Sequence, residues 1–283
     1  MSGPLENSRD HRTRDRSAER FERESSEVVH GLRAGLAVFV VRRDEILRVF
    51  HSTSVRNEVG ELVRWAVSRG LNCEELSDGK LDRIAESDHH EGLCLLTRPR
   101  RWCSPNDLAH TLSTAAGGGR AIALDRVRNP YNIGAIVRTA AFFGLDGMLL
   151  GAPAPHSGLA PAAVRVAEGG AEHVRVARTT DLAETLARMR ARGVRVVGAD
   201  GRATASAAGF PFGGPVVLAL GNEREGLGDR VRAQCDAVVA IRGTGAMESL
   251  NVAVAAGLLV AEMVRQARTD DRPRGRRVHK TSL

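Results

Sequence analysis

Short apolar runs alternate with helical patterns through the second half of the chain. These runs do not alternate apolar with polar residues, which is typical of strands covered on both faces. The predicted strands are Ala121 to Leu124, Gly147 to Leu150, Val174 to Ala177, Val194 to Gly198, Val216 to Leu220 and Ala237 to Ile241. Helical spacing is found over residues 132–143, 159–168, 181–191 and 247–266. The pattern predicts an α/β fold with an open, mostly parallel six-stranded sheet, whose ligand site lies at the carboxyl ends of the strands.

A small α/β domain is predicted ahead of this sheet, over residues 28–97. One helical face carries Leu32, Leu36, Phe39 and Val40. Further helices are expected over 55–69 and 78–86, and short strands over 46–50, 71–76 and 92–96. Residues 98–119 contain two prolines and a run of three glycines, which predicts a linker. The second domain then covers residues 120–267.

Charge is unevenly distributed along the chain. The formal net charge is +7, and all basic residues except Lys80 and Lys280 are arginines. Residues 1–27 carry six arginines against seven acidic residues, which predicts a charged flexible arm. From Arg265 to the end there are seven basic residues against two acidic ones, and residues 268–283 are predicted to be a basic flexible tail. The excess favours a nucleic-acid partner, although genomic base composition alone would also enrich arginine.

Composition argues against several other classes of protein. Aromatic residues make up only 4% of the chain, too few for a surface that stacks single-stranded bases. The four cysteines form no CxxC pair, and His89-His90-Glu91 lacks an evident third ligand, so neither a disulfide framework nor a metal site is expected. No apolar run has the length of a membrane span, and the N-terminus lacks a signal-peptide hydrophobic region. We therefore expect a soluble cytoplasmic protein without a membrane partner.

Three loops that follow predicted strands are rich in polar residues and glycine. The first runs from Asn129 to Ala140 and contains Asn132, a candidate helix cap, and Arg138. The second, residues 220–227, contains Gly-Asn-Glu after an apolar strand. The third, residues 241–252, brings Ser249 and Asn251 to the start of the last helix, where backbone N–H groups are free.

Familiar nucleotide-binding motifs are missing from these loops. The chain has no G-x-x-x-x-G-K-[ST] phosphate loop. The run Gly243-Thr244-Gly245 lies at the last strand–helix junction, whereas a dinucleotide fingerprint or an ordinary Rossmann-type methyltransferase needs its glycines after the first strand. Each loop alone is a common feature of α/β proteins, so their combination and order must carry the interpretation.

Together and in this order, the three loops resemble the motifs of the SpoU/TrmH branch of the SPOUT RNA methyltransferases. The motifs are N-x-G-x-x-x-R-T-A, G-N-E-x-x-G-L and E-S-L-N-V, and the match covers about residues 120–266. Residues 165–174 are similar to the family's linking segment. Residues 28–97 resemble the substrate-binding domain of the ribosomal protein L30e type that many members carry. The resemblance implies a C-terminal trefoil knot in the sheet and a homodimer.

The resemblance also implies S-adenosylmethionine as cofactor and a ribose 2′-hydroxyl as methyl acceptor. Family members bind the cofactor largely through the backbone of the knotted loops. This corresponds here to Gly221, Ile241 and Leu250, and to Ala199 at the end of the preceding strand.

Arg138 matches the catalytic arginine of the family. Because guanidinium stays protonated in proteins, we favour a role in clamping a phosphate and stabilising the forming alkoxide over a role as general base. The other polar motif residues are assigned to orienting Arg138, the ribose and the cofactor loop. They are Asn132, Glu223, Ser249 and Asn251.

The sequence thus predicts an S-adenosylmethionine-dependent 2′-O-ribose methyltransferase acting on structured RNA, ribosomal RNA before transfer RNA. Recognition by phosphate contacts and shape fits a protein with few aromatic residues. Two alternatives stay open, a tRNA 2′-O-methyltransferase and a non-catalytic RNA-binding or ribosome-assembly protein with the same fold. The presence of Arg138, Glu223, Ser249 and Asn251 argues against the non-catalytic alternative.

Overall fold

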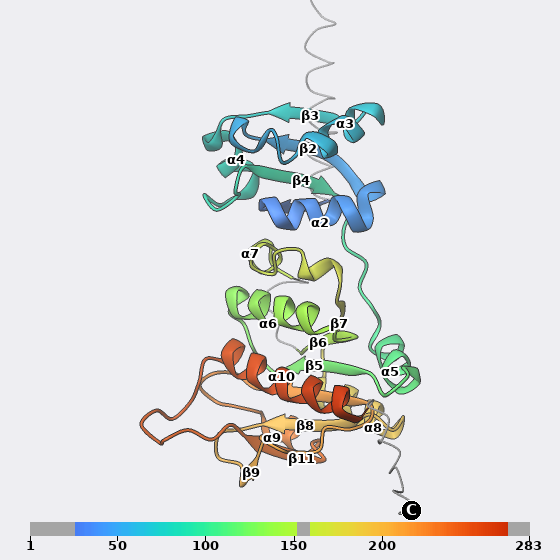
Figure 1. Cartoon of the computed structure of the whole chain (residues 1–283), viewed down its shortest axis with the longest axis vertical. Coiled ribbons are helices and arrows are strands. Elements are labelled where there is room, and N and C mark those ends of the chain that lie inside the picture. The colour runs from blue at the N-terminus through green and yellow to red at the C-terminus, as the bar shows by residue number, and fades with distance from the viewer. Residues whose placement is uncertain (1–25, 152–158, 271–283) are drawn as a thin grey trace, which may run out of the picture. The chain divides into compact units, whose positions relative to one another are not determined.

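The computed structural model describes residues 26–151 and 159–270, with side chains as far as residue 267 (Figure 1). The chain divides into two compact units. The first unit combines Met1–Arg101 with Ala160–Glu172, and the second combines Trp102–Leu159 with His173–Leu283. The predicted arm up to residue 25 and the predicted tail from residue 271 lie outside the described residues.

The first unit contains a four-stranded sheet in the order β1-β4-β2-β3. Both β1 and β2 run antiparallel to β4, while β3 runs parallel to β2. The strands are β1 (Glu27–His30), β2 (Ile46–His51), β3 (Asn72–Glu75) and β4 (Leu93–Thr97). The helices are α2 (Leu32–Arg42), α3 (Gly60–Ser68), α4 (Asp78–Ala85) and α7 (Pro161–Val166), with 3-10 turns η1 (Arg43–Glu45), η2 (Thr53–Val55) and η3 (Gly170–Glu172). Strand β4 lies between β1 and β2 and is buried along its whole length.

Two features of this unit differ from the expectation. Strand β1 was not predicted, because its four residues directly follow the charged N-terminal segment and give no clear apolar run. The helix expected over 159–168 exists as α7, but it packs in the first unit and not with the large sheet. As a result, the chain passes between the two units three times, after Arg101, Leu159 and Glu172.

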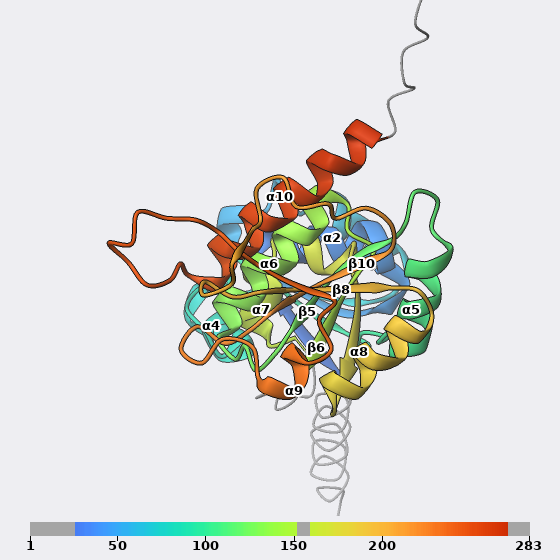
Figure 2. The same ribbon diagram turned by 90° about the horizontal axis from the view of Figure 1, so that it is seen from below.

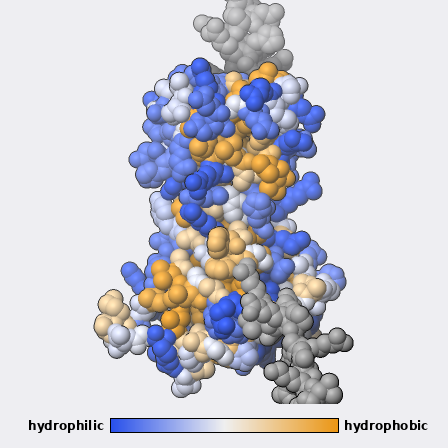
Figure 3. Space-filling model, in the orientation of Figure 1, coloured by the Kyte–Doolittle hydropathy of each residue, from blue (hydrophilic) through white to orange (hydrophobic). Residues whose placement is uncertain are grey.

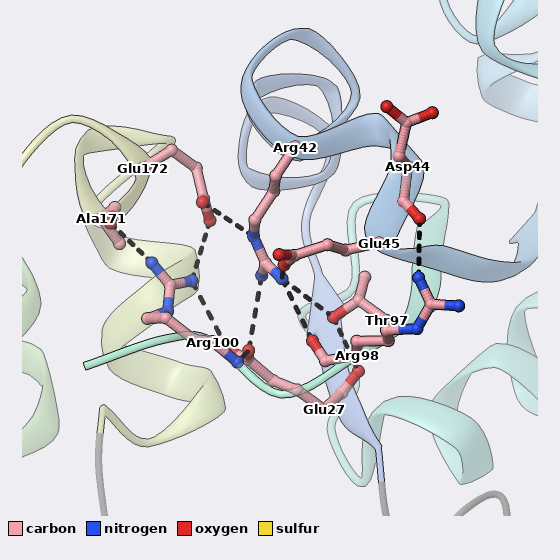
Figure 4. Close-up of polar contacts among 9 residues, drawn as sticks. All are labelled: Glu27, Arg42, Asp44, Glu45, Thr97, Arg98, Arg100, Ala171 and Glu172. Carbon is pink, nitrogen blue, oxygen red and sulfur yellow. Dashed lines mark hydrogen bonds and ion pairs between the residues drawn. The ribbon is translucent and has the colours of Figure 1, made fainter.

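A buried group of ion pairs attaches residues 160–172 to the rest of the first unit (Figure 4). We call Arg42, Arg100, Glu27 and Glu172 the buried ion cluster. Glu172 pairs with Arg42 at 2.9 Å and with Arg100 at 2.8 Å, and Glu27 lies 3.4 Å from both arginines. The side chains of Glu172 and Arg100 are only 4% and 9% exposed. Burial alone would lower the pKa of Arg42, but the nearby Glu172 and Glu27 outweigh it and raise this pKa.

The second unit contains a seven-stranded sheet in the order β7-β6-β5-β10-β8-β11-β9, with every pair parallel. The strands are β5 (Arg120–Leu124), β6 (Gly147–Gly151), β7 (Arg175–Thr179), β8 (Arg195–Ala199), β9 (Ala205–Ser206), β10 (Val216–Leu220) and β11 (Ala237–Ala240). The helices are α5 (Pro105–Thr114), α6 (Pro130–Phe143), α8 (Leu182–Ala191), α9 (Asp229–Arg232) and α10 (Val252–Asp270).

Helices cover both faces of this sheet (Figure 2). On one face, Leu108 and Leu112 of α5 and Leu186 of α8 pack in one apolar core with Val217 of β10. Helices α6 and α10 lie side by side over the other face. Strands β6 and β10 are buried at every position, which explains their continuous apolar runs.

The predicted α/β class with a parallel sheet is confirmed, and the six expected strands correspond to β5, β6, β7, β8, β10 and β11. The expected number of six was wrong by one. The seventh strand, β9, has two exposed residues and therefore no apolar pattern. The predicted linker also contains α5, because its glycines and prolines masked a helical pattern with buried Leu108 and Leu112.

Candidate functional site

Helix α6 begins directly after the loop that follows β5. Asn129 caps it by accepting hydrogen bonds from the backbone N–H of Tyr131 at 2.9 Å and of Asn132 at 3.4 Å, and Pro130 occupies the first helical position. The expectation that Asn132 caps this helix is wrong, because Asn129 already satisfies these N–H groups. The side chain of Asn132 takes part in tertiary contacts instead.

Three of the predicted site residues are joined in one hydrogen-bonded network, although they lie in three different loops. The Asn132 Nδ2 group donates to the carboxylate of Glu223. The Asn251 Nδ2 group donates to Asn132 Oδ1 at 3.1 Å. Asn251 also accepts from the backbone N–H of Ala253 at 2.8 Å, so the same side chain caps α10. We call Asn132, Glu223 and Asn251 the open network, because Asn251 is exposed and the other two are only half-buried.

The loop over residues 221–228, which we call the Glu223 loop, is tightly folded. The Asn222 side chain accepts from the backbone N–H of Arg224 at 2.9 Å, and the Gly226 N–H donates to the Asn222 carbonyl at 2.8 Å. A Cβ on Gly221 would lie only 2.1 Å from the carbonyl carbon of Gly226. Only glycine therefore allows the two ends of this loop to approach each other, and this closure presents Glu223 to Asn132.

The predicted cofactor-binding positions follow neighbouring strands. Ala199, the last residue of β8, stands in register with Leu220 of β10 and Val239 of β11. Gly221 follows β10 directly, and Ile241 follows β11 directly. Because these strands are parallel and adjacent, their carboxyl ends form one edge of the sheet.

Asp200 supports this edge next to Ala199. It accepts a hydrogen bond from the Arg202 backbone N–H at 2.9 Å and forms an ion pair with Arg232. Burial alone would raise the pKa of Asp200, but these contacts hold the pKa below its usual value. The carboxylate is thus kept ionised and fixes the turn after β8.

Arg138, Ser249 and Leu250 occupy exposed positions. Arg138 lies on α6, six residues after Asn132, which is about 9 Å further along the helix axis. Residues 242–250 are all exposed, and we call residues 241–251 the Ser249 loop. The expected final helix over 247–266 starts later, at Val252, because Asn251 provides its cap.

Asn129, Asn222, Asp125 and Arg126 shape the site but were not singled out from the sequence. Asn129 precedes a proline at the start of a helical pattern, which is a usable capping signal. For Asp125 and Arg126 no local signal exists, because their partners lie about 100 positions later in the chain.

The described residues contain no group of three or more His, Cys, Asp or Glu side chains placed to hold a metal ion. In the same part of the chain, no helix has both the length and the apolar character needed to cross a membrane.

Comparisons with protein families agree with the motifs. A model of the SpoU rRNA Methylase family matches residues 119–261, and a model described as RNA 2'-O ribose methyltransferase substrate binding matches residues 28–103. An uncharacterized tRNA/rRNA methyltransferase of Mycobacterium sp. strain KMS is 38% identical over 224 residues, covering 79% of this chain and 71% of that protein. A protein of the same description from Mycobacterium avium strain 104 is 37% identical over 85% of this chain and 75% of its own length.

Solved structures share the fold over most of the chain. The AdoMet-bound rRNA methyltransferase from Sinorhizobium meliloti has a TM-score of 0.71 and 26% identity, covering 87% of this chain and 89% of that one. The SpoU methyltransferase AviRb from Streptomyces viridochromogenes in complex with AdoMet also has a TM-score of 0.71, covering 87% and 92% of the two chains. At 22% sequence identity, this similarity supports a shared fold only. The family models and the Mycobacterium relatives show that this chain belongs to the SpoU rRNA Methylase family of RNA methyltransferases.

Proposed function

We propose that this protein transfers a methyl group from S-adenosylmethionine to a ribose 2′-hydroxyl of structured RNA. The observation that carries the proposal is the open network, in which Asn132, Glu223 and Asn251 come from three separate motifs and meet in one set of hydrogen bonds. Arg138 lies on the same helix as Asn132. A network of this kind orients side chains without closing them off from a substrate.

The sheet edge supports S-adenosylmethionine as cofactor. Ala199, Gly221 and Ile241 place backbone groups at the ends of three adjacent parallel strands, and the Ser249 loop beside them is exposed. Ala199, Gly221, Ile241 and Leu250 would hold the cofactor mainly through backbone contacts, so these positions need a fixed shape more than polarity. Bound S-adenosylmethionine supplies an electrophilic methyl group on a sulfonium sulfur.

We assign to Arg138 the role of stabilising the negative charge that develops on the RNA. Negative charge grows on the 2′-oxygen, next to a phosphate, as its proton leaves to water. The oxygen then forms its bond to the methyl carbon while the bond between that carbon and the sulfonium sulfur breaks, which leaves an uncharged thioether. The guanidinium of Arg138 binds this phosphate and stabilises the forming alkoxide, which a permanently charged, forked donor does well. Asn132, Glu223, Ser249 and Asn251 hold Arg138, the ribose and the Ser249 loop in the reactive arrangement.

We propose a homodimer formed through α6 and α10. Phe142 on α6 is 82% exposed, Met247 just before α10 is 81% exposed, and Val254 and Leu258 on α10 are exposed on one helical face. Figure 3 shows apolar side chains gathered over the start of α10 and the neighbouring α6. An exposed apolar patch beside polar site residues is typical of a protein–protein interface.

Further parts of the proposal are not tested by the structure. A C-terminal trefoil knot comes from the family resemblance. The domain limits of 28–97 for substrate binding and 120–267 for catalysis come from the pattern of elements along the chain, and a cytoplasmic location comes from the composition. The basic tail is proposed to add salt-sensitive RNA affinity.

Ribosomal RNA is the proposed substrate, and transfer RNA is the second candidate. The matched family is described by rRNA methylation, and the AdoMet-bound protein from Sinorhizobium meliloti is an rRNA methyltransferase. The Mycobacterium relatives carry the broader description tRNA/rRNA methyltransferase, which keeps transfer RNA open.

The test uses the full chain with methyl-labelled S-adenosylmethionine and separate ribosomal and transfer RNA fractions. A methylated 2′-oxygen cannot attack the adjacent phosphate, so after alkaline hydrolysis the label should remain in alkali-resistant dinucleotides from ribosomal RNA. Label in mononucleotides would indicate base methylation and contradict the ribose assignment. No label in any RNA would favour a non-catalytic RNA-binding protein.

A further inference from the structure

The backbone at Arg126, two residues after β5, has an unusual conformation. Its φ angle is +59°, in the left-handed region that residues with a Cβ rarely adopt. Such a conformation persists only where the surroundings enforce it, and it is often found at functional sites. The contacts of Arg126 and of the preceding Asp125 show what enforces it here.

Arg126 contacts the Glu223 loop through both its side chain and its backbone carbonyl. Its guanidinium forms an ion pair with Glu225 and donates a hydrogen bond to the carbonyl of Gly226 at 3.1 Å. Its own carbonyl accepts from Asn222 Nδ2 at 3.2 Å. A single residue after β5 therefore contacts the Glu223 loop on both sides of Glu223.

Asp125 holds the end of the same loop. Its side chain is buried, and Oδ2 accepts from the Gly228 N–H at 2.7 Å. Its backbone N–H donates to the carbonyl of Leu220, the last residue of β10, at 2.8 Å. Asp125 thereby fixes both the start and the end of the Glu223 loop against β5.

We propose that Asp125 and Arg126 are positioning residues for methyl transfer, which act by holding the Glu223 loop so that Glu223 meets Asn132. This inference rests on the proposed function for the role of Glu223. Neither residue belongs to the open network. They affect the reaction only by fixing the position of the loop. The left-handed backbone conformation of Arg126 allows its side chain and its carbonyl to contact the same loop.

The test compares two variants of the full chain. Arg126→Gly removes the guanidinium but accepts a positive φ freely, so it separates the side-chain contacts from backbone strain. Glu225→Gln removes the ion pair from the other side and leaves Arg126 in place. Arg188→Ala is the matched control, because Arg188 also pairs with a carboxylate, Glu184, but on the exposed surface of α8.

Hydrogen exchange of the amides of residues 222–227 is measured without substrate, and turnover is measured with RNA and labelled cofactor. Arg126→Gly should speed this exchange about tenfold and lower kcat about tenfold, with a smaller effect of the same kind from Glu225→Gln. Arg188→Ala should change neither.

Two outcomes would overturn the proposal: exchange in Arg126→Gly equal to that of the wild type, or faster exchange with kcat within about twofold of the wild type. A wild-type protein that methylates no RNA would instead refute the proposed function, while the exchange measurement still decides whether Arg126 holds the loop.

Discussion

Two polar clusters of this protein have opposite characters. The buried ion cluster of the first unit joins Arg42, Arg100, Glu27 and Glu172 by ion pairs of opposite charge, and Arg100 Nε is its one buried side-chain nitrogen without a hydrogen-bond partner among the described residues (Figure 4). The side chains of this cluster are between 4% and 19% exposed, whereas in the open network of the second unit Asn251 is an exposed residue and Asn132 and Glu223 are half-buried. Both clusters connect segments far apart in the sequence. The difference indicates that the first cluster stabilises the fold, whereas the second is accessible to a substrate.

The comparison shows why charge alone does not identify a site. Pairing in the buried ion cluster compensates for the loss of hydration, so removing one partner leaves a costly buried charge. In the open network, hydrogen bonds orient amide and carboxylate groups that water still reaches. Substitutions in the buried ion cluster should therefore change stability, and substitutions in the open network should change activity.

The largest effect is expected at Arg138. Arg138→Ala should lower kcat about 100-fold to 1000-fold, because it removes the cation assigned to the developing alkoxide. S-adenosylmethionine affinity, measured by calorimetric titration, should stay within about twofold of the wild type, because the predicted cofactor positions are backbone groups elsewhere. Equal losses of turnover and cofactor affinity would indicate that Arg138 holds the structure.

At the buried ion cluster, Glu172→Gln should lower the free energy of unfolding by about 3 kcal/mol. The substitution keeps the size of the side chain but removes the charge that faces two buried guanidinium groups. Asp44→Asn is the control in the same unit, because its pair with Arg69 is exposed and should contribute less than about 0.5 kcal/mol. Denaturant unfolding measures both, and similar losses in the two variants would show that burial does not distinguish these pairs.

At the open network, Asn251→Ala should lower kcat about tenfold. It should also cost about 1 kcal/mol of stability, because the cap of α10 is lost. Asn251→Asp keeps an oxygen for the cap but cannot donate to Asn132, so it should lose activity with little change in stability. Wild-type turnover in both variants would remove Asn251 from the site.

The buried His30 should make the stability of the first unit depend on pH. Burial, then the charges of Arg165 and His90, lower its pKa below 6.5, although Glu91 opposes them, and neither ring nitrogen has a hydrogen-bond partner among the described residues. Below pH 6.5 the unfolded chain binds a proton that the folded state resists, so stability should fall as the pH drops, by at most about 1.4 kcal/mol per pH unit.

The measurement compares unfolding of the wild type and His30→Leu between pH 7.5 and pH 5.5. The variant should lose part of the pH slope. An identical slope in both proteins would assign the dependence to other groups.

The smallest effect is expected from the tail. Deleting residues 270–283 should weaken RNA binding several-fold at low salt and less at high salt, because the tail contributes counterion release. Cofactor binding should not change. Unchanged RNA affinity at low salt would indicate that the arginine excess reflects genomic base composition and not RNA binding.

Much of the fold could be predicted from the sequence, because buried parallel strands such as Val216–Leu220 leave continuous apolar runs. The two-residue strand β9 leaves none. Residues 160–172 have an ordinary helical pattern, and no local feature shows that Glu172 pairs with Arg42 and Arg100 in the first unit.

The site shows the same limit. The motifs placed Asn132, Glu223 and Asn251 after parallel strands, and the strand order brings them together. Arg126 holds the Glu223 loop through contacts between residues about 100 positions apart in the chain. A single sequence contains no local pattern that predicts such contacts. The roles of the predicted site residues stay predictions.

The most direct test of the difference between the stabilising ion cluster and the catalytic site is the rate of methyl transfer per folded molecule. It is measured for the wild type, Arg138→Ala and Glu172→Gln at saturating RNA and cofactor, under conditions where all three proteins are folded. The account predicts that Glu172→Gln stays within about twofold of the wild type while Arg138→Ala falls at least about 100-fold. Equal losses in the two variants, or full activity of Arg138→Ala, would contradict it.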